Sequence, residues 1–219
     1  MEDVSPLSGT ELFSSLSEEA LARVALKAST ARLERNATLF NEGDEAKELF
    51  VVLSGRIAIA KSSPDGRESL VALMEPGDLF GEMPLFDEEP RSGSARALER
   101  SEVVRVPFDV VRSELETRPG LLWDVVHLFA TRLRAADDAL ADAMLLDVTG
   151  RTAKRLLELA GDADEFALPI TQEELAGLVG ASRERVNKAI SAFIRLGWIE
   201  QSERRYRILN RPRLVERAR

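Results

Sequence analysis

Residues 170–194 read ITQEELAGLVGASRERVNKAISAFI, and this stretch determines the fold of the C-terminal part of the chain. Thr171 and Glu174 have the spacing of a capping box, which indicates that a helix begins there. Gly180 can end that helix in the left-handed conformation, and Ser182 can cap a second helix immediately afterwards. Two short helices around a glycine turn predict a helix-turn-helix.

The second helix, expected over residues 183–194, separates apolar from polar side chains by helical spacing. We expect one face to be buried, with Val186, Ala189, Ile190 and Phe193. The opposite face carries only hydrogen-bonding side chains, namely Arg183, Glu184, Asn187, Lys188 and Ser191. Such groups near a helix N-terminus can read base edges in the major groove, because arginine pairs with guanine and a carboxylate accepts from cytosine. A plain solvated helix would also be polar outside, so the helix alone leaves both interpretations open.

Beyond Gly197, residues 198–200 and 205–209 alternate as two strands joined by residues 201–204, which predicts a small wing. Three arginines of the wing would then face phosphate, namely Arg204, Arg205 and Arg207. Arginines on an exposed strand are also unremarkable. The charge distribution also favours DNA binding by this part of the chain. Residues 169–219 have a net charge of +5 and the rest of the chain has −13, which together give −8.

Upstream, from about residue 37, the apolar pattern has a period of two in short runs at residues 49–53, 57–60, 70–73 and 103–106. Turn residues separate these runs at positions 42–44, 54–55, 64–67 and 76–78. Many short strands with such turns predict an antiparallel β-roll or barrel. Residues 9–31 have helical periodicity, with a helix-start signal at Ser17, so a short helical preface should precede the roll.

A long helix is expected after Pro119, with apolar residues alternating by four and three at Leu122, Val126, Phe129, Leu133, Ala136, Leu140 and Ala143. This heptad seam predicts dimerisation, although a helix packed on its own domain would show a similar stripe. Asp147 should cap a new helix that begins at Val148. The expected fold is therefore α+β: a β-roll over residues 1–119, a dimerisation helix over 120–146 and a winged helix-turn-helix over 147–219.

Composition excludes several classes of function. The 219 residues contain no cysteine and one histidine, His127, so disulfides, thiolate metal sites and cysteine nucleophiles are ruled out and other metal sites are disfavoured. Cupin-like enzymes share the strand pattern but need a cluster of histidine ligands, and we therefore expect neither an enzyme nor a bound metal. No stretch approaches the ~20 apolar residues of a membrane span. With an acidic start at residues 1–3, we expect a cytoplasmic protein without membrane contact.

Residues 80–95 read FGEMPLFDEEPRSGSA, and residues 146–151 read LDVTGR. With these segments, the chain resembles the cAMP receptor protein/FNR (CRP/FNR) family of bacterial transcription regulators, in order from about residue 10 to 210. The first segment looks like the phosphate-binding cassette of that family. The resemblance implies a cytoplasmic homodimer whose roll binds a small effector, cAMP, and which then binds palindromic double-stranded DNA. RNA polymerase is a further partner that the resemblance leaves open.

The chemistry of the cassette suits a cyclic nucleotide. Arg91 offers a planar donor fork to a phosphodiester, Ser92 offers a hydroxyl and an N–H, and Glu82 can accept from the ribose 2′-hydroxyl. The backbone after Gly81 can form a helix start that attracts an anion. An Arg–Glu pair in an acidic surface loop is the structural alternative. The effector-binding residues implied by the resemblance are Gly81, Glu82, Met83, Arg91, Ser92, Arg132, Ala136 and Asp137.

The chain departs from the family on the long helix. Where cAMP-responsive relatives carry two polar residues that contact adenine, this sequence has Ala136 and Asp137. The phosphate and sugar half of the site is therefore present while the half that reads the base is altered. A different nucleotide, or a regulator that binds DNA without an effector, are the two alternatives.

In the helix-turn-helix, Arg183, Glu184 and Lys188 stand at positions that read bases in relatives with TGTGA-like half-sites. Lys188 replaces the arginine that those relatives often have, and so it lacks the planar fork. The DNA-binding residues implied by the resemblance, including three at phosphate-contacting positions (Thr171, Gln172 and Ser182), are Thr171, Gln172, Ser182, Arg183, Glu184, Asn187 and Lys188.

Overall fold

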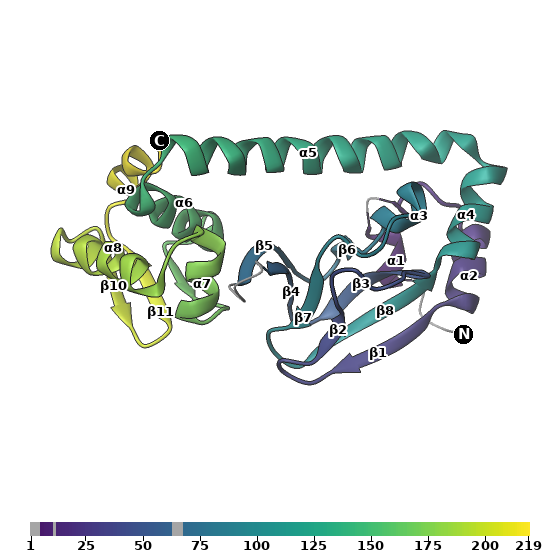
Figure 1. Cartoon of the computed structure of the whole chain (residues 1–219), viewed down its shortest axis with the longest axis horizontal. Coiled ribbons are helices and arrows are strands. Elements are labelled where there is room, and N and C mark those ends of the chain that lie inside the picture. Colours follow the sequence, from purple (N-terminus) through teal and green to yellow (C-terminus); the bar gives the residue numbers. More distant parts are fainter. Residues whose placement is uncertain (1–4, 11, 63–67) are drawn as a thin grey trace. The chain divides into compact units, whose positions relative to one another are not determined.

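Two four-stranded antiparallel sheets form a β-roll in the first of two compact units, Met1–Leu133 and Arg134–Arg219 (Figure 1). The computed structural model describes residues 5–10, 12–62 and 68–219, so the turn expected at 64–67 and the acidic residues 1–3 lie outside the described residues. One sheet has the order β1 (Ser29–Leu33), β8 (Ser101–Pro107), β3 (Glu48–Ser54) and β6 (Leu79–Phe80). The other has the order β2 (Thr38–Phe40), β7 (Ser94–Ala97), β4 (Ile57–Ser62) and β5 (Glu68–Met74). The predicted antiparallel roll is confirmed.

Strand β3 is the centre of the roll because both of its faces are buried. Phe50 and Val52 point into the cluster between the sheets, together with Phe80 and Val103. Leu49 and Val51 point the other way, into a second cluster built with the helices. A strand that is buried on both sides reads as an unbroken apolar run, which is why residues 49–53 are apolar at every position.

Short helices close the outer face of the β1-β8-β3-β6 sheet: α1 (Ser5–Ser8), α2 (Glu18–Lys27), α4 (Phe108–Thr117) and a 3₁₀ turn (Pro119–Leu121). Ser17 caps α2 as expected, with its hydroxyl accepting from the Ala20 N–H. The expectation of helical character over residues 9–31 was too wide, because residues 29–33 pair with β8 as a strand. Arg23 fastens α2 to α4 through two hydrogen bonds of 2.8 and 2.9 Å to the buried Glu114 carboxylate, which lower its pKa.

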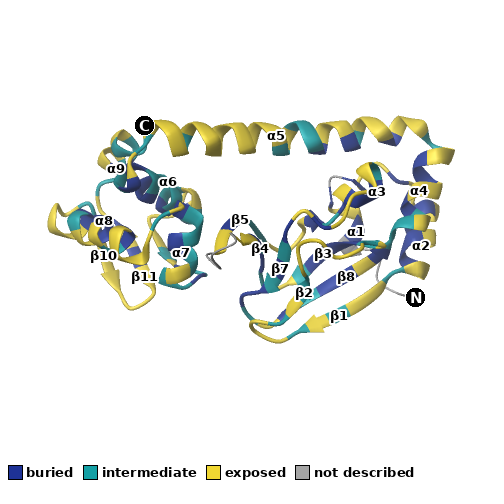
Figure 2. Ribbon diagram, viewed as in Figure 1, coloured by how far each residue is buried: buried dark blue, intermediate teal, exposed yellow. Residues whose placement is uncertain are grey.

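Helix α5 (Leu122–Leu145) carries two apolar stripes rather than one. Val125 and Leu128 are buried in the roll, and Phe129 packs there too, edge-on to Phe86 with ring centroids 5.4 Å apart. Phe129, which the spacing places on the seam, is thus a half-buried residue that also packs against the roll. The other large seam residues are exposed, as Figure 2 shows for most of this helix: Leu122, Val126, Leu133 and Leu140.

The second unit contains the expected winged helix-turn-helix, described by α6 (Val148–Ala160), β9 (Glu165–Ala167), α7 (Gln172–Val179), α8 (Arg183–Arg195), β10 (Ile199–Ser202), β11 (Arg205–Ile208) and α9 (Arg211–Arg217). Its sheet has the order β10-β11-β9. Residues 201 and 202 belong to β10, so the wing turn is shorter than the expected 201–204. Strand β9 and helix α9 were missed by the sequence analysis. Among the described residues no helix is both long and apolar enough to cross a membrane.

Candidate effector and DNA sites

Arg91 lies inside the roll with only 5% of its surface exposed. Its guanidinium donates to two backbone carbonyls, through Nη1 to Gly81 at 2.6 Å and through Nη2 to Glu48 at 2.7 Å. Burial lowers the pKa of the Arg91 guanidinium, and the carboxylates of Glu48, Glu82 and Asp44 oppose that shift. Because arginine still carries its charge under any ordinary condition, the fold holds a fixed cation at this position.

Gly81 lets Arg91 come this close. Its φ is +76°, and a Cβ there would lie 2.7 Å from Arg91 Nη1 and 3.2 Å from the Phe50 ring. Only glycine satisfies both the left-handed backbone and the close approach. The helix start expected just after this residue is confirmed, because α3 (Met83–Asp87) begins there.

Glu82 is the second buried charge of the cassette, with 1% of its surface exposed. Its Oε1 accepts a hydrogen bond from Arg132 of α5, and the same guanidinium donates to the carbonyl of Leu79. Arg132 therefore ties α5 directly to the cassette. Two atoms here are buried and have no hydrogen-bond partner in the described part of the chain: Glu82 Oε2 and Arg91 Nε.

The other expected effector residues are more exposed. Ser92 donates to the Met83 sulfur at 3.6 Å, and both residues lie on the surface of the cassette. Ala136 and Asp137 lie on the part of α5 that belongs to the second unit, and both are exposed there. The structure thus gathers Gly81, Glu82, Met83, Arg91, Ser92 and Arg132 within the first unit, and the effector-binding roles of these six residues and of Ala136 and Asp137 stay predictions.

The helix-turn-helix has the local geometry that its sequence predicts. Thr171 Oγ1 accepts from the Glu174 N–H at 3.2 Å, while the Glu174 carboxylate accepts from the Thr171 N–H at 2.6 Å, which completes the capping box. Gly180 ends α7 with φ +66° and ψ 44°, and Ser182 caps α8. The apolar face of α8 is buried as expected, at Val186, Ala189, Ile190 and Phe193.

The outer face of α8 is open to solvent at Arg183, Glu184 and Lys188, with Asn187 half-buried beside them. Lys188 Nζ lies 2.7 Å from Glu184 Oε1, and both side chains are about three-quarters exposed. The hydrogen bond from Lys188 lowers the pKa of Glu184. The carboxylate of Glu184 is chemically able to accept a hydrogen bond from a base such as cytosine.

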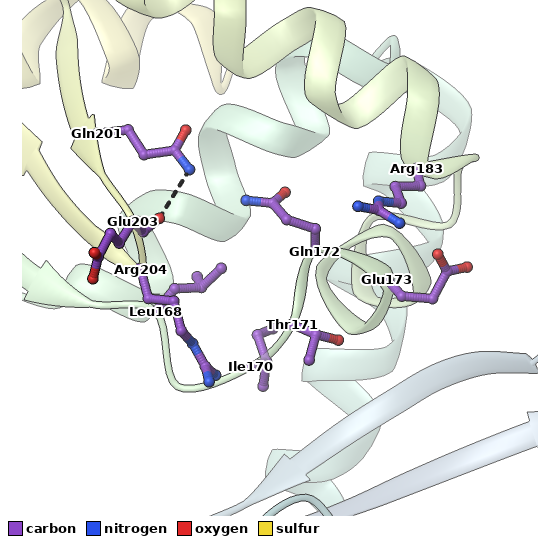
Figure 3. Close-up of a pocket in the computed structure, with 9 residues that line it drawn as sticks. All are labelled: Leu168, Ile170, Thr171, Gln172, Glu173, Arg183, Gln201, Glu203 and Arg204. Carbon is purple, nitrogen blue, oxygen red and sulfur yellow. Dashed lines mark hydrogen bonds between the residues drawn. The ribbon is translucent and has the colours of Figure 1, made fainter.

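A hollow of about 320 Å³ lies between α8, the start of α7 and the wing (Figure 3). Three of the expected DNA-binding residues line it: Thr171, Gln172 and Arg183. The wing contributes Gln201, Glu203 and Arg204. Arg204 was expected to face phosphate, whereas Gln201 and Glu203 were not predicted as site residues. Gln201 is held by its own turn, because its amide donates to the Glu203 carbonyl at 3.2 Å.

Gln172 joins the helix-turn-helix to the wing. Its Nε2 donates to the Tyr206 hydroxyl at 2.6 Å, and the Tyr206 ring stacks on Phe166 of β9 with centroids 5.6 Å apart. Burial raises the pKa of Tyr206, and the hydrogen bond with Gln172 opposes this shift. The side chain expected to contact phosphate is thus also a structural link, which the sequence could not reveal because Tyr206 is 34 residues away.

The segment after α5 is fixed by two charged side chains. Asp147 caps α6, accepting from the Gly150 N–H at 2.8 Å, and it also pairs with Arg217 of α9. Arg151 donates to the carbonyls of Leu146 at 2.8 Å and Val179 at 2.9 Å. The residue that follows α5 is therefore connected, through one arginine, to the last residue of α7, shortly before α8.

Known proteins share both halves of this arrangement. The cyclic nucleotide-binding domain family matches residues 30–118, and the Crp-like helix-turn-helix domain family matches residues 150–217. A CRP-like cAMP-activated global transcriptional regulator of Mycobacterium tuberculosis is 38% identical over 215 residues, covering 95% of this chain and 96% of that protein. The cAMP-activated global transcriptional regulator Vfr of Pseudomonas aeruginosa is 31% identical, covering 77% of this chain and 83% of its own.

The fold agrees with these sequence relationships. The structure of FixK2 from Bradyrhizobium japonicum superposes with a TM-score of 0.79 at 23% identity, covering 86% of this chain and 96% of that one. The roll with its cassette, the long helix and the winged helix-turn-helix occur in the order that the sequence predicts. The chain belongs to the CRP/FNR family of bacterial DNA-binding transcription regulators.

Proposed function

We propose that this regulator is switched by cAMP, which the roll binds through Arg91 and Glu82. The observation that carries the proposal is that two buried atoms of the cassette, Arg91 Nε and Glu82 Oε2, have no hydrogen-bond partner among the described residues. One is a donor and the other an acceptor, and unpaired buried groups of this kind are rare in stable proteins. A cyclic nucleotide offers the complement of each, an anionic phosphodiester for the arginine and a ribose hydroxyl for the carboxylate.

The remaining cassette residues complete the proposed site. Arg91 keeps donors for an anion because only two of its five N–H groups go to backbone carbonyls. Ser92 and Met83 lie at the exposed rim, where Ser92 can redirect its weak bond to sulfur toward a better acceptor. The printed names of the relatives support cAMP as the first effector to try, since both are described as cAMP-activated.

The switch acts, in this proposal, through Arg132. Its guanidinium joins α5 to Glu82 Oε1 and to the Leu79 carbonyl, so a hydroxyl that binds Glu82 Oε2 would share one carboxylate with α5. The exposed apolar stripe of α5 supports pairing with a second copy of the chain along that helix. The effector then works only through its different affinity for the two states of that dimer.

The DNA half of the proposal assigns base reading to Arg183, Glu184 and Lys188, and phosphate contacts to Thr171, Gln172 and Ser182. In a symmetric dimer the two recognition helices would meet successive major grooves about 34 Å apart. Exposure of the polar face of α8 supports this role, as does the hollow shared with the wing. We further assign residues 1–119 to effector binding, 120–146 to dimerisation and 147–219 to DNA binding, in a cytoplasmic protein.

Calorimetry with cAMP and with cGMP tests the effector site. We expect wild-type protein to bind cAMP, Arg91→Ala to bind it at least tenfold more weakly, and Arg100→Ala to behave as wild type. Arg100 is the matched control because it is an exposed arginine of the same roll, outside the cassette. Equal heats for wild type and Arg91→Ala would reject the site.

A mobility shift with a palindromic duplex of two TGTGA half-sites tests the switch. We expect cAMP to strengthen binding to this duplex by at least tenfold in the wild type and not in Arg91→Ala. Affinity that no nucleotide changes would instead support the effector-independent regulator, for which the altered positions Ala136 and Asp137 are the motivating observation.

A further inference from the structure

The Arg91 guanidinium rests on a cluster of three phenylalanines that belong to three different strands. Phe50 stacks between Phe40 and Phe80, with ring centroids 5.5 and 5.3 Å away. Arg91 Cζ lies 4.2 Å from the Phe40 centroid and 5.3 Å from the Phe50 centroid. Phe40 is therefore the ring in closest contact with the cation.

The Arg91 guanidinium is held by two kinds of contact, hydrogen bonds to carbonyl oxygens and packing against an aromatic ring. All of its N–H donors lie in the plane of the group, and its faces have none. The carbonyls of Gly81 and Glu48 accept hydrogen bonds from Nη1 and Nη2, whereas the Phe40 ring packs against Cζ. A ring packed on Cζ restricts the direction of the fork without using a donor, so Nε–H and the remaining Nη protons stay available to an anion.

Phe40 differs from the other two rings in its burial and in its position in the roll. Phe50 and Phe80 expose at most 2% of their surface and belong to the core between the sheets. Phe40 is half-buried at the edge of that core, on β2, which pairs with β7 just after the cassette. The turn that follows Phe40 also makes two hydrogen bonds with the backbone of Arg91, each 2.9 Å long. The Gly43 N–H donates to the Arg91 carbonyl, and the Arg91 N–H donates to the Asp44 carbonyl.

We propose that Phe40 is a positioning residue for the effector: its ring orients the Arg91 fork, and the effector affinity depends on that contact. The proposal rests on the proposed function, because it concerns how tightly the roll holds a cyclic nucleotide. Phe40 does not touch the nucleotide itself and acts through Arg91.

The test compares Phe40→Leu with Phe40→Tyr and with Phe108→Leu. Leucine keeps an apolar side chain but removes the π face, whereas tyrosine keeps the ring and can place its hydroxyl toward solvent from this half-buried position. Phe108 is the matched control, a half-buried phenylalanine that packs on the other core cluster. We expect Phe40→Leu to weaken cAMP binding by roughly 3- to 10-fold. Phe40→Tyr and Phe108→Leu should stay within about twofold of wild type.

A second readout needs no nucleotide. In ¹⁵N spectra of the free protein, the Nε–H resonance of Arg91, identified by its loss in Arg91→Lys, should shift in Phe40→Leu and not in Phe108→Leu, because a ring at 4.2 Å alters the local magnetic field. An unmoved resonance, or cAMP affinities for Phe40→Leu and Phe108→Leu that agree within twofold, would overturn the proposal. A wild type that binds no cyclic nucleotide while the resonance still shifts would overturn the proposed function and leave the orienting contact in place.

Discussion

Arg91 in the roll and Arg183 in the winged unit are both candidate ligand-binding arginines, and the fold holds them in opposite ways. Arg91 is buried, with two donors on backbone carbonyls and an aromatic ring against its Cζ. Arg183 is exposed on the first turn of α8, at the edge of the hollow in Figure 3. The roll therefore uses Arg91 both for folding and for its proposed ligand, whereas the winged unit keeps the proposed base-reading side chain of Arg183 outside its core.

The largest expected effect is on stability, and it comes from substituting alanine for a glycine that has a positive φ. Each unit offers one such glycine, so the two variants compare the units directly. Gly81→Ala should destabilise the roll by about 2–4 kcal/mol, because a Cβ adds a strained backbone to a clash with Arg91 Nη1 and the Phe50 ring. Gly180→Ala should cost only about 1 kcal/mol, since its φ is +66° but nothing lies within 4 Å of the added Cβ. Chemical denaturation of each full-length variant measures both values.

Cyclic-nucleotide binding gives the control for this pair. Gly81→Ala should also lose cAMP affinity, because the Arg91 fork must move, whereas Gly180→Ala should keep it. Equal loss of stability in the two variants would contradict the contrast between the units, since it would mean that the close approach of Arg91 contributes nothing to folding.

In the winged unit, truncation of an exposed arginine should lower DNA affinity and leave stability unchanged. Arg183→Ala should weaken binding to a specific palindrome by about 1–3 kcal/mol, because one base or phosphate contact is lost. Its unfolding free energy should stay within about 0.5 kcal/mol of wild type, as for other exposed substitutions. Arg185→Ala is the matched control, an exposed arginine two positions further along the same helix. A loss of stability as large as the loss of affinity would show that Arg183 also supports the fold.

The two units also differ in how much of them the sequence could predict. The capping box, the glycine turn and the spacing of Val186, Ala189 and Phe193 are local signals, and each was confirmed. The strands β2, β6, β7 and β9 were missed because each has two to four residues and exists only through its pairing with distant strands. The helical periodicity of residues 9–31 likewise predicted a helix at residues 29–31, but these residues pair with β8 as a strand.

The contacts of the candidate sites were harder to predict than their residues. The resemblance named Arg91 and Glu82, but the partners of Arg91 include the backbone carbonyl of Glu48, 43 residues away, and a main-chain oxygen leaves no mark in the sequence. Phe129 shows the same limit on α5. Its spacing fits the seam, yet its ring packs against Phe86 of the roll, because an α-helix with two apolar partners carries two overlapping stripes.

The smallest expected effect concerns Asp147, an exposed carboxylate that contrasts with the buried Glu82. The hydrogen bond from the Gly150 N–H, and then the bond from Arg217, hold the pKa of Asp147 below its ordinary value of 3.8. A carboxylate with a lowered pKa stabilises the fold above pH 3.8, and this contribution is lost as the pH falls through the lowered value. Asp147→Asn keeps a good helix cap but loses the ion pair, so it should cost only about 0.5 kcal/mol at pH 7.

Trp198 can report on this unit alone, because its indole stacks on Phe193 and the chain's other tryptophan, Trp123, is 76% exposed and replaceable. In a Trp123→Phe background, the urea midpoints measured with and without the Asp147→Asn substitution should differ slightly at pH 7 and converge as the pH falls below about 4. High salt at pH 7 should narrow the difference as well, because the pair is exposed. A difference that survives both acid and salt would mean that the cap itself distinguishes the two side chains, and that the ion pair with Arg217 is not its cause.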